Sequence, residues 1–225
     1  MIKITDSTVF NVCADCIVNT INCVGFMGKG IALEFALRYP ELEKEYVEEC
    51  HKKQIHTGTV YFYEIDGQKI INFPTKFHFK YPSQMEWIEQ GLQYFVNNYK
   101  KWNIKSIAFP ILGATNGGLD KKEVEEVMNK YLSNLDIDVY ICRSTKLEGK
   151  EYDMVMAFKQ TPVSEIKKHV RLTSKQYTAL EENQGKIKRF MDINKIDGIG
   201  IDTYKSIFKL FYFTNIHGEE QLSLF

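Results

Sequence analysis

The sequence predicts an α/β fold in which a mixed β-sheet is covered by helices on both faces. Strand-like and helix-like patterns alternate from residue 2 to about residue 142. Two glycine-rich loops each follow an apolar strand pattern and lead directly into a helical pattern. The pair Asp66-Gly67, between two β-rich runs, predicts a two-residue hairpin and therefore one antiparallel strand.

Each expected element has a local signal. Apolar and β-branched runs predict strands over 2–5, 16–20, 59–65, 68–73, 106–110 and 138–142. Helical spacing of apolar residues predicts helices over 31–38, 41–53, 85–98 and 120–133. Pro40 interrupts the first helical stretch, and Asp120 is a favourable N-cap for the last.

After about residue 159 only helical patterns remain, over 164–170, 174–194 and 202–213, with a break at Gly198-Ile199-Gly200. The last of these helices is so apolar that it must pack on the first domain or on a partner. We therefore expect a first domain over 1–158, a helical extension over 159–218 and a flexible tail over 219–225. A helix-turn-helix around Gly198 is a lesser alternative.

Composition is typical of a globular protein with a sizeable core, and the zero net charge does not indicate any class of partner. The 225 residues carry no formal net charge and are 44% hydrophobic, which suits a sizeable core. The start does not read as a signal peptide, no apolar run approaches the ~20 residues that span a bilayer, and the five cysteines are odd in number. We expect a cytoplasmic protein. Cys13 and Cys16 have the spacing of half a zinc or redox site, but no second pair follows.

The first glycine-rich loop, with Gly25, Gly28 and Gly30, leads into the helix expected at 31–38. Such a loop collects backbone N–H groups and the positive end of a helix dipole, and phosphates bind there. The spacing fits neither a Walker A loop nor a dinucleotide fingerprint. A tight turn without a ligand is the alternative.

The second glycine-rich loop, over 110–120, also runs from a strand into a helix. In an open α/β sheet, both loops would lie beyond the carboxyl ends of their strands, where ligands bind. Together they suit the two sides of a diphosphate.

Lys76 ends a buried-looking strand and follows Phe73-Pro74-Thr75. A lone lysine is usually a solvated charge, but this position would hold the amine over the pocket. A lysine with a depressed pKa can act as a nucleophile on a sugar C1 carbon.

Three segments, VNTINCVGFMGKGIALEF, INFPTK and AFPILGATNGGLD, occur in an order and spacing that closely resemble the macrodomain of the DarG antitoxin group. The resemblance covers about residues 1–158. It implies a three-layer α/β/α macrodomain that binds ADP-ribose and needs no metal or other cofactor. DarG-type macrodomains remove ADP-ribose that the toxin DarT attaches to thymidine in single-stranded DNA, so ADP-ribosylated single-stranded DNA and a DarT-like toxin are the implied partners. A non-catalytic ADP-ribose reader, and a hydrolase of protein-linked ADP-ribose or O-acetyl-ADP-ribose, remain alternatives.

The resemblance also assigns residues. Lys76 matches the catalytic lysine, Asn22 the residue that orients the distal ribose, and Thr8 and Val9 the adenine contact. The remaining implied ADP-ribose contacts are Met27, Gly28, Lys29, Gly30, Ile31, Ala32, Thr75, Leu112, Gly113, Ala114, Thr115, Asn116, Gly117, Gly118 and Leu119. A related eukaryotic group pairs its lysine with an aspartate where this chain has Gly117, and we interpret Asp120 as a helix cap instead.

The chain ends with a pentapeptide that resembles the motif by which bacterial proteins dock on the DNA sliding clamp. Its anchors are Gln221, Leu222, Leu224 and Phe225. The segment 159–218 does not match the toxin-binding half of DarG, which leaves open an orphan repair-type hydrolase. Its mildly basic helices would then contact DNA phosphates or cap the macrodomain.

Overall fold

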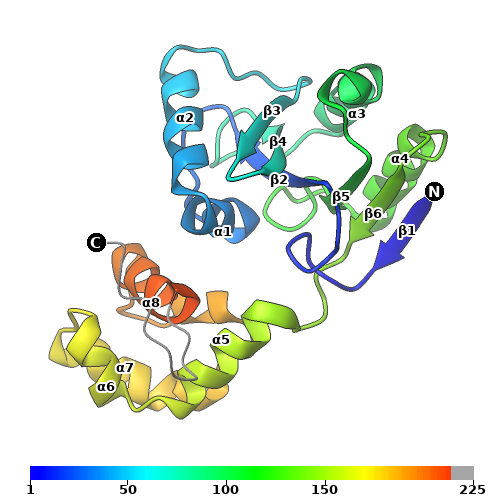
Figure 1. The fold of residues 1–225 in the computed structure, drawn as a ribbon. Coiled ribbons are helices and arrows are strands. Elements are labelled where there is room, and N and C mark those ends of the chain that lie inside the picture. Colours follow the sequence, from blue (N-terminus) through cyan, green and yellow to red (C-terminus); the bar gives the residue numbers. More distant parts are fainter. Residues whose placement is uncertain (214–225) are drawn as a thin grey trace. The chain divides into compact units, whose positions relative to one another are not determined.

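The computed structural model describes residues 1–213, which form two compact units that divide between Lys146 and Leu147 (Figure 1). The sequence suggested a boundary at residue 158. The structure instead assigns the whole of helix α5 (Gly149–Gln160) to the second unit. The clamp-like pentapeptide lies outside the described residues.

The first unit is built on one six-stranded sheet. In chain order its strands are β1 (Ile2–Thr5), β2 (Cys16–Asn22), β3 (Tyr61–Ile65), β4 (Gln68–Lys76), β5 (Ser106–Pro110) and β6 (Asp138–Cys142). Their spatial order is β1-β6-β5-β2-β4-β3. Only the β3–β4 pairing is antiparallel, so the sheet is mixed as predicted.

Helices cover both faces of this sheet. The helices of the first unit are α1 (Gly30–Arg38), α2 (Pro40–His51), α3 (Met85–Asn98), the short 3₁₀ helix η1 (Tyr99–Trp102) and α4 (Lys121–Leu132). Figure 1 shows α1 and α2 on one side of the sheet and α3 and α4 on the other. Successive residues of β2 point to opposite faces: Val18 packs with the α3 and α4 cluster, and Ile17 with the α1 cluster. The predicted α/β/α layering is confirmed.

Two local signals act as expected. Asp66 and Gly67 both have positive φ, 52° and 77°, as a two-residue hairpin turn with right-handed strand twist requires. The Asp120 carboxylate accepts hydrogen bonds from the backbone N–H groups of Lys122 and Glu123, at 2.9 and 3.1 Å. Asp120 is therefore the N-cap of α4, as predicted.

The strand order places three loops together. β2 lies between β4 and β5, and all three run parallel. Their carboxyl ends, at Asn22, Lys76 and Pro110, consequently meet at the same edge of the sheet. Both glycine-rich loops and the lysine start from this edge.

The second unit is helical. It contains α5, α6 (Val163–His169), α7 (Ser174–Asn183), the 3₁₀ helices η2 (Gln184–Lys186) and η3 (Phe190–Lys195), and α8 (Ile201–Phe213). The rings of Phe158, Phe190, Phe208 and Phe211 are buried and meet edge-on or tilted, with centroids 5.6–6.0 Å apart. Phe208 and Phe211 of the last helix therefore pack within their own unit.

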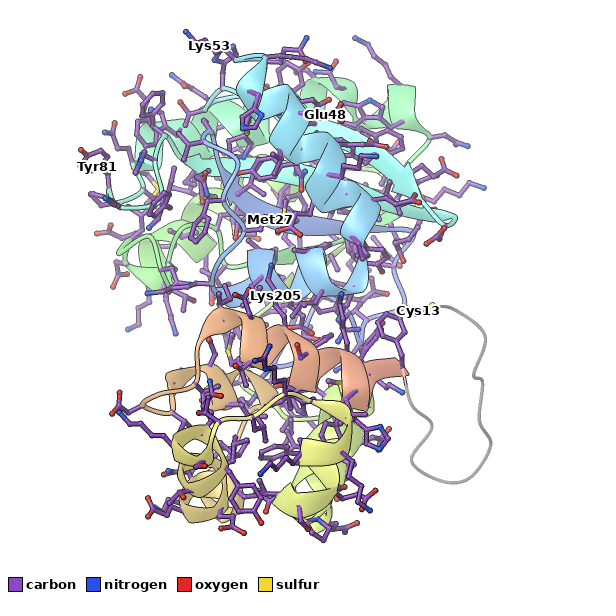
Figure 2. All side chains as sticks on the ribbon, turned by 90° about the vertical axis from the view of Figure 1, so that its left-hand side faces the viewer. Cys13, Met27, Glu48, Lys53, Tyr81 and Lys205 are labelled. Atoms are coloured by element: carbon purple, nitrogen blue, oxygen red, sulfur yellow. The ribbon has the colours of Figure 1, made fainter. Side chains whose placement is uncertain are left out.

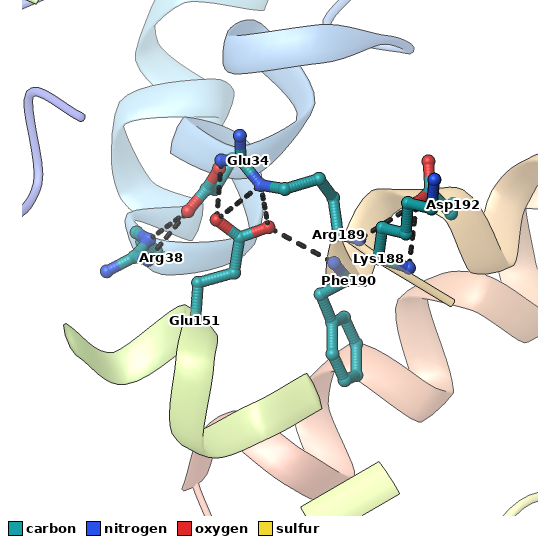
Figure 3. Close-up of polar contacts among 7 residues, drawn as sticks. All are labelled: Glu34, Arg38, Glu151, Lys188, Arg189, Phe190 and Asp192. Atoms are coloured by element: carbon teal, nitrogen blue, oxygen red, sulfur yellow. Dashed lines mark hydrogen bonds and ion pairs between the residues drawn. The ribbon is translucent and has the colours of Figure 1, made fainter. Parts of the chain in front are cut away.

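A largely buried ion pair joins α5 to η3 (Figure 3). The Glu151 carboxylate accepts from the Arg189 guanidinium at 2.6 Å and from the Phe190 backbone N–H at 3.1 Å. Asp192 accepts from the backbone N–H of Arg189 at 2.8 Å and so orders the turn that presents it. The carboxylate is satisfied by several donors, which is what a group that is only 8% exposed requires.

The long helix predicted over 174–194 is wrong. α7 ends at Asn183, and Gly185 lies in the 3₁₀ turn that follows, because glycine adds conformational freedom that weakens a helix interior. The lesser helix-turn-helix alternative also fails, since the residues between α7 and α8 form 3₁₀ turns rather than a helix next to a short turn.

Candidate functional site

The first glycine-rich loop leads into the N-terminus of α1, which has no side-chain cap. Gly25 and Gly30 have φ of 76° and 59°, a region that favours glycine. α1 begins at Gly30 without a side-chain cap and with no acidic residue in its first turn. Its first backbone N–H groups and the positive end of its dipole are thus available to an anion.

Asn22 holds this loop through two side-chain hydrogen bonds. Its amide donates to the Phe26 carbonyl at 2.7 Å, and its side-chain oxygen accepts from the Val24 N–H at 2.9 Å. The buried Tyr46 hydroxyl donates toward the carbonyl and the side-chain oxygen of Asn22, at 2.9 and 3.1 Å. Asn22 is also the β2 partner of Lys76 in the sheet register. The residue that resemblance assigns to the sugar therefore also holds the first glycine-rich loop in shape.

Lys76 lies between the two loops. Its ammonium group donates to the backbone carbonyl of Asn116 in the second loop. Its own carbonyl accepts from the Cys23 thiol at 3.4 Å, and Cys23 N–H donates to the Phe77 carbonyl at 3.1 Å. Partial burial lowers the pKa of Lys76 below its usual value, and no carboxylate contributes to this shift.

The second loop folds onto a buried serine. A Cβ added at Gly117 would lie 2.1 Å from the Gly113 carbonyl oxygen and 2.2 Å from the Ser83 Oγ. The Ser83 N–H donates to the Gly117 carbonyl at 2.9 Å, and Leu119 N–H donates to the Gly113 carbonyl at 3.2 Å. The loop is compact enough that its backbone N–H groups have a fixed direction.

The two loops touch each other. A Cβ at Gly30 would lie 2.5 Å from the Asn116 side-chain nitrogen. Asn116 thus contacts Gly30 with its side chain and Lys76 with its carbonyl. Asn22, Gly30, Lys76 and Asn116 form one group at the sheet edge, which we call the loop junction.

The other expected site residues divide by exposure. Thr8, Val9, Met27, Gly28, Ala32, Thr75, Leu112, Gly113, Ala114 and Gly117 are buried, whereas Lys29, Thr115, Asn116 and Gly118 are exposed. Ile31 and Leu119 are half-buried. Val9 belongs to the apolar cluster of Phe35 in α1 rather than to the loop junction.

Two functional candidates were missed by the sequence. Ser83 lies just before the helix expected at 85–98, and its hydroxyl is buried against Gly117 with no hydrogen-bond partner among residues 1–213. Tyr46 lies within the helix expected at 41–53, and its hydroxyl donates to Asn22. Neither residue has a local sequence signal, because Ser83 contacts Gly117 and Tyr46 contacts Asn22 only once the chain is folded.

Metal and membrane features are absent from the part of the chain that the structure describes. It contains no group of three or more His, Cys, Asp and Glu side chains arranged for a metal ion. Cys13 is exposed, whereas Cys16 is fully buried, and burial raises the pKa of the Cys16 thiol. No helix within residues 1–213 has the length and apolar character needed to cross a membrane.

Comparison of the sequence with known proteins finds a matching family and several relatives. The sequence profile of the Macro domain family matches residues 18–128. The chain is 42% identical over 132 residues to a DNA ADP-ribosyl glycohydrolase of Mycobacterium tuberculosis, covering 56% of this chain and 38% of the relative. A DNA ADP-ribosyl glycohydrolase of Thermus aquaticus is 36% identical over 146 residues, covering 63% and 41%. The chain thus spans about two fifths of the length of these curated relatives.

Solved structures give the same picture. The macrodomain of Mycobacterium tuberculosis DarG superposes with a TM-score of 0.62 at 37% identity, covering 63% of this chain and 97% of that one. The macrodomain of Thermus aquaticus DarG gives 0.61 at 35% identity, covering 64% and 98%. Thermosipho africanus DarTG in complex with ADP-ribose gives 0.59 at 30% identity, covering 65% and 43%.

Proposed function

Since this chain belongs to the macrodomain family, we propose that it is a hydrolase that releases ADP-ribose from thymidine in DNA. The observation that carries the proposal is the position of Lys76, an amine of lowered pKa held between the two glycine-rich loops. The similarity to proteins named DNA ADP-ribosyl glycohydrolase supports the reaction class.

The two loops would bind the diphosphate. The uncapped start of α1 offers N–H groups from one side, and the loop over Gly113–Gly118 offers N–H groups from the other. Phosphates bound there would fix the distal ribose next to the loop junction. Binding energy from the diphosphate would in this way be used to orient the C1 carbon of the sugar toward Lys76.

Lys76 would then act as the nucleophile. Its neutral amine attacks C1, a C–N bond forms, and the bond from C1 to the thymine ring nitrogen breaks with its electron pair going to the base. The proton lost from the new lysyl nitrogen neutralises the base, and the adduct opens to an imine. Water hydrolyses the imine, which frees ADP-ribose and restores the amine. In the competing role, Lys76 stays protonated and stabilises the charge of the leaving base.

Asn22 would position the sugar. Its amide already contacts the Phe26 carbonyl within the loop. A ribose hydroxyl bound at the loop junction would share this amide, so sugar binding and loop shape would be linked. Thr8 and Val9, after β1, remain our proposal for the adenine contact.

The decisive experiment compares wild type with Lys76→Ala on an oligonucleotide that carries ADP-ribosylated thymidine. Released ADP-ribose is followed by thin-layer chromatography, and ADP-ribose affinity by calorimetry. We expect the variant to lose release while it keeps most of its ADP-ribose affinity. Reduction with borohydride during turnover should link ADP-ribose covalently to wild type and not to the variant.

Three results would revise the proposal. Turnover at the wild-type rate by Lys76→Ala contradicts the role of the lysine. Binding without release by wild type identifies an ADP-ribose reader. Release only from ADP-ribosylated protein or from O-acetyl-ADP-ribose moves the reaction to another substrate.

Partners of the whole protein are also proposals. A fusion of a DNA ADP-ribosyl transferase with a DNA ADP-ribosyl glycohydrolase in Thermosipho africanus is 37% identical over 141 residues. This supports a DarT-like transferase as the enzyme that supplies the substrate. We also propose that Gln221–Phe225 binds the sliding clamp; deletion of these five residues should abolish co-purification with the clamp, and unchanged binding would contradict it.

A further inference from the structure

Four aromatic side chains next to the candidate site form a connected surface, which we call the aromatic ledge: Phe26, His78, Phe79 and Tyr81. The rings of Phe26 and Phe79 are 4.7 Å apart, those of His78 and Phe79 4.4 Å, and those of His78 and Tyr81 5.5 Å. Phe26 comes from the first glycine-rich loop, and the other three follow Lys76 directly.

The ledge is exposed to solvent. Phe26 is 46% exposed, Phe79 40% and Tyr81 63%. Figure 2 shows Tyr81 projecting from the surface of the first unit, whereas Met27, next to Phe26 in sequence, lies inside it. Contiguous aromatic exposure of this kind is costly in water and marks a binding surface.

The ledge is fixed to the candidate site. A Cβ at Gly28 would lie 2.2 Å from the Phe26 ring, so this ring covers the backbone of the first phosphate loop. The Phe26 carbonyl accepts from the Asn22 amide, and the Phe77 carbonyl accepts from Cys23 N–H. The His78 carbonyl accepts a hydrogen bond from the Tyr81 N–H at 3.1 Å, and the His78 Nδ1 accepts one from the Lys80 N–H at 3.2 Å. These contacts tie the backbone that carries the rings to Asn22 and to the end of β4 at Lys76.

The charges around the ledge suit a polyanion. The segments 23–30 and 75–84 contain lysines and a histidine but no aspartate or glutamate. The Lys80 ammonium lies 5.8 Å from the Phe79 ring centroid. Stacking rings interleaved with cations are the features with which proteins bind single-stranded nucleic acid, because every base offers a π face and every nucleotide a phosphate.

We propose that the aromatic ledge stacks the unpaired bases that flank the ADP-ribosylated nucleotide of a single DNA strand. The proposal rests on the proposed function and adds a binding surface to it. Bases within a duplex cannot reach these rings, since they are already stacked on each other. The ledge thus selects single strands, while the loop junction binds the ADP-ribose itself.

The test measures how ledge variants bind and process oligonucleotides, in the full chain. Phe79→Ala and Tyr81→Ala should each raise KM for an ADP-ribosylated single strand about tenfold, at similar kcat. Affinity for free ADP-ribose and release from ADP-ribosylated thymidine nucleoside should not change. Phe79→Trp and Tyr81→Phe keep an aromatic face and should retain wild-type KM. Tyr94→Ala, a change at a 39% exposed tyrosine on α3, is the matched control and should have no effect.

Abasic nucleotides on both sides of the modified thymidine provide a second arm. They remove the bases and keep the phosphates, so they should weaken binding to wild type and change little in Phe79→Ala. Equal losses in both proteins, or ledge variants with wild-type KM, would overturn the proposal and favour a protein as the occupant. Absence of ADP-ribose release by wild type would contradict the proposed function alone, because affinity for unmodified single strands, measured by anisotropy, still tests the ledge.

Discussion

Gly117→Ala tests the packing of the second glycine-rich loop most directly. The new methyl group would lie 2.1 Å from the Gly113 carbonyl oxygen and 2.2 Å from the Ser83 Oγ, whereas ordinary contacts begin at 3.4 Å. The loop must therefore open by about 1 Å, and one of the two clashing atoms is backbone that cannot rotate away. This strains the hydrogen bond from Ser83 N–H to the Gly117 carbonyl.

Overpacking of this kind costs about 1–3 kcal/mol. For a cost near 2 kcal/mol, the melting temperature should fall by about 4–8 °C. Affinity for ADP-ribose should fall about tenfold or more, because the N–H groups proposed to hold the diphosphate are displaced. Differential scanning calorimetry and isothermal titration measure the two quantities.

Gly185→Ala is the control for this variant. It is the same change at a glycine of the second unit with ordinary φ and nothing within 4 Å of the added Cβ. It should leave ADP-ribose affinity unchanged and stability equal or slightly higher. If Gly117→Ala melted and bound like Gly185→Ala, the tight approach of the loop to Ser83 would be refuted.

Two further predictions concern the loop junction. Tyr46→Phe removes the hydroxyl that donates to the buried Asn22 carbonyl, whereas the Asn22 side-chain oxygen keeps the Val24 N–H as a donor. The free energy of unfolding should therefore fall by about 1–2 kcal/mol in chemical denaturation, with a rise in KM for the modified oligonucleotide. An unchanged midpoint and KM would show that this hydroxyl does not hold Asn22 in place. The pH profile of kcat distinguishes the two roles of Lys76. Burial lowers the pKa of its amine, and only the neutral amine attacks, so kcat should rise with pH up to this pKa and then level off; a rate that falls over the same range would assign the cationic role.

The sequence predicted the elements that have local signals. The limits of α3, β5 and β6 agree with the expected 85–98, 106–110 and 138–142, because a helical stripe or a short buried strand defines each of them. β2 extends further than the expected 16–20, to Asn22, since its parallel pairing with β4 continues past the apolar pattern. Strand order and register depend on the whole sheet and are not contained in any local pattern.

The candidate site was predictable to a similar degree. Glycine spacing indicated both loops, and the end of a strand indicated Lys76. The contact of Lys76 with the Asn116 carbonyl, and the burial of Ser83 under Gly117, arise only when segments distant in the sequence come together. Three rings of the aromatic ledge lie in the run KFHFKY, but no sequence pattern predicted their surface, and their contact with Phe26 depends on the fold.

Because Gly30 approaches Asn116 closely, a substitution in one glycine-rich loop changes which residues the other loop can accept. A side chain at residue 30 would occupy the space of the Asn116 amide, and φ of 59° already disfavours any residue with a Cβ. A chimera that takes one loop from a relative and keeps the other would therefore combine surfaces that were never selected together. Libraries that diversify this protein should vary residues 25–30 and 113–118 as one block, and substitutions at residue 30 should be tolerated better when residue 116 becomes smaller.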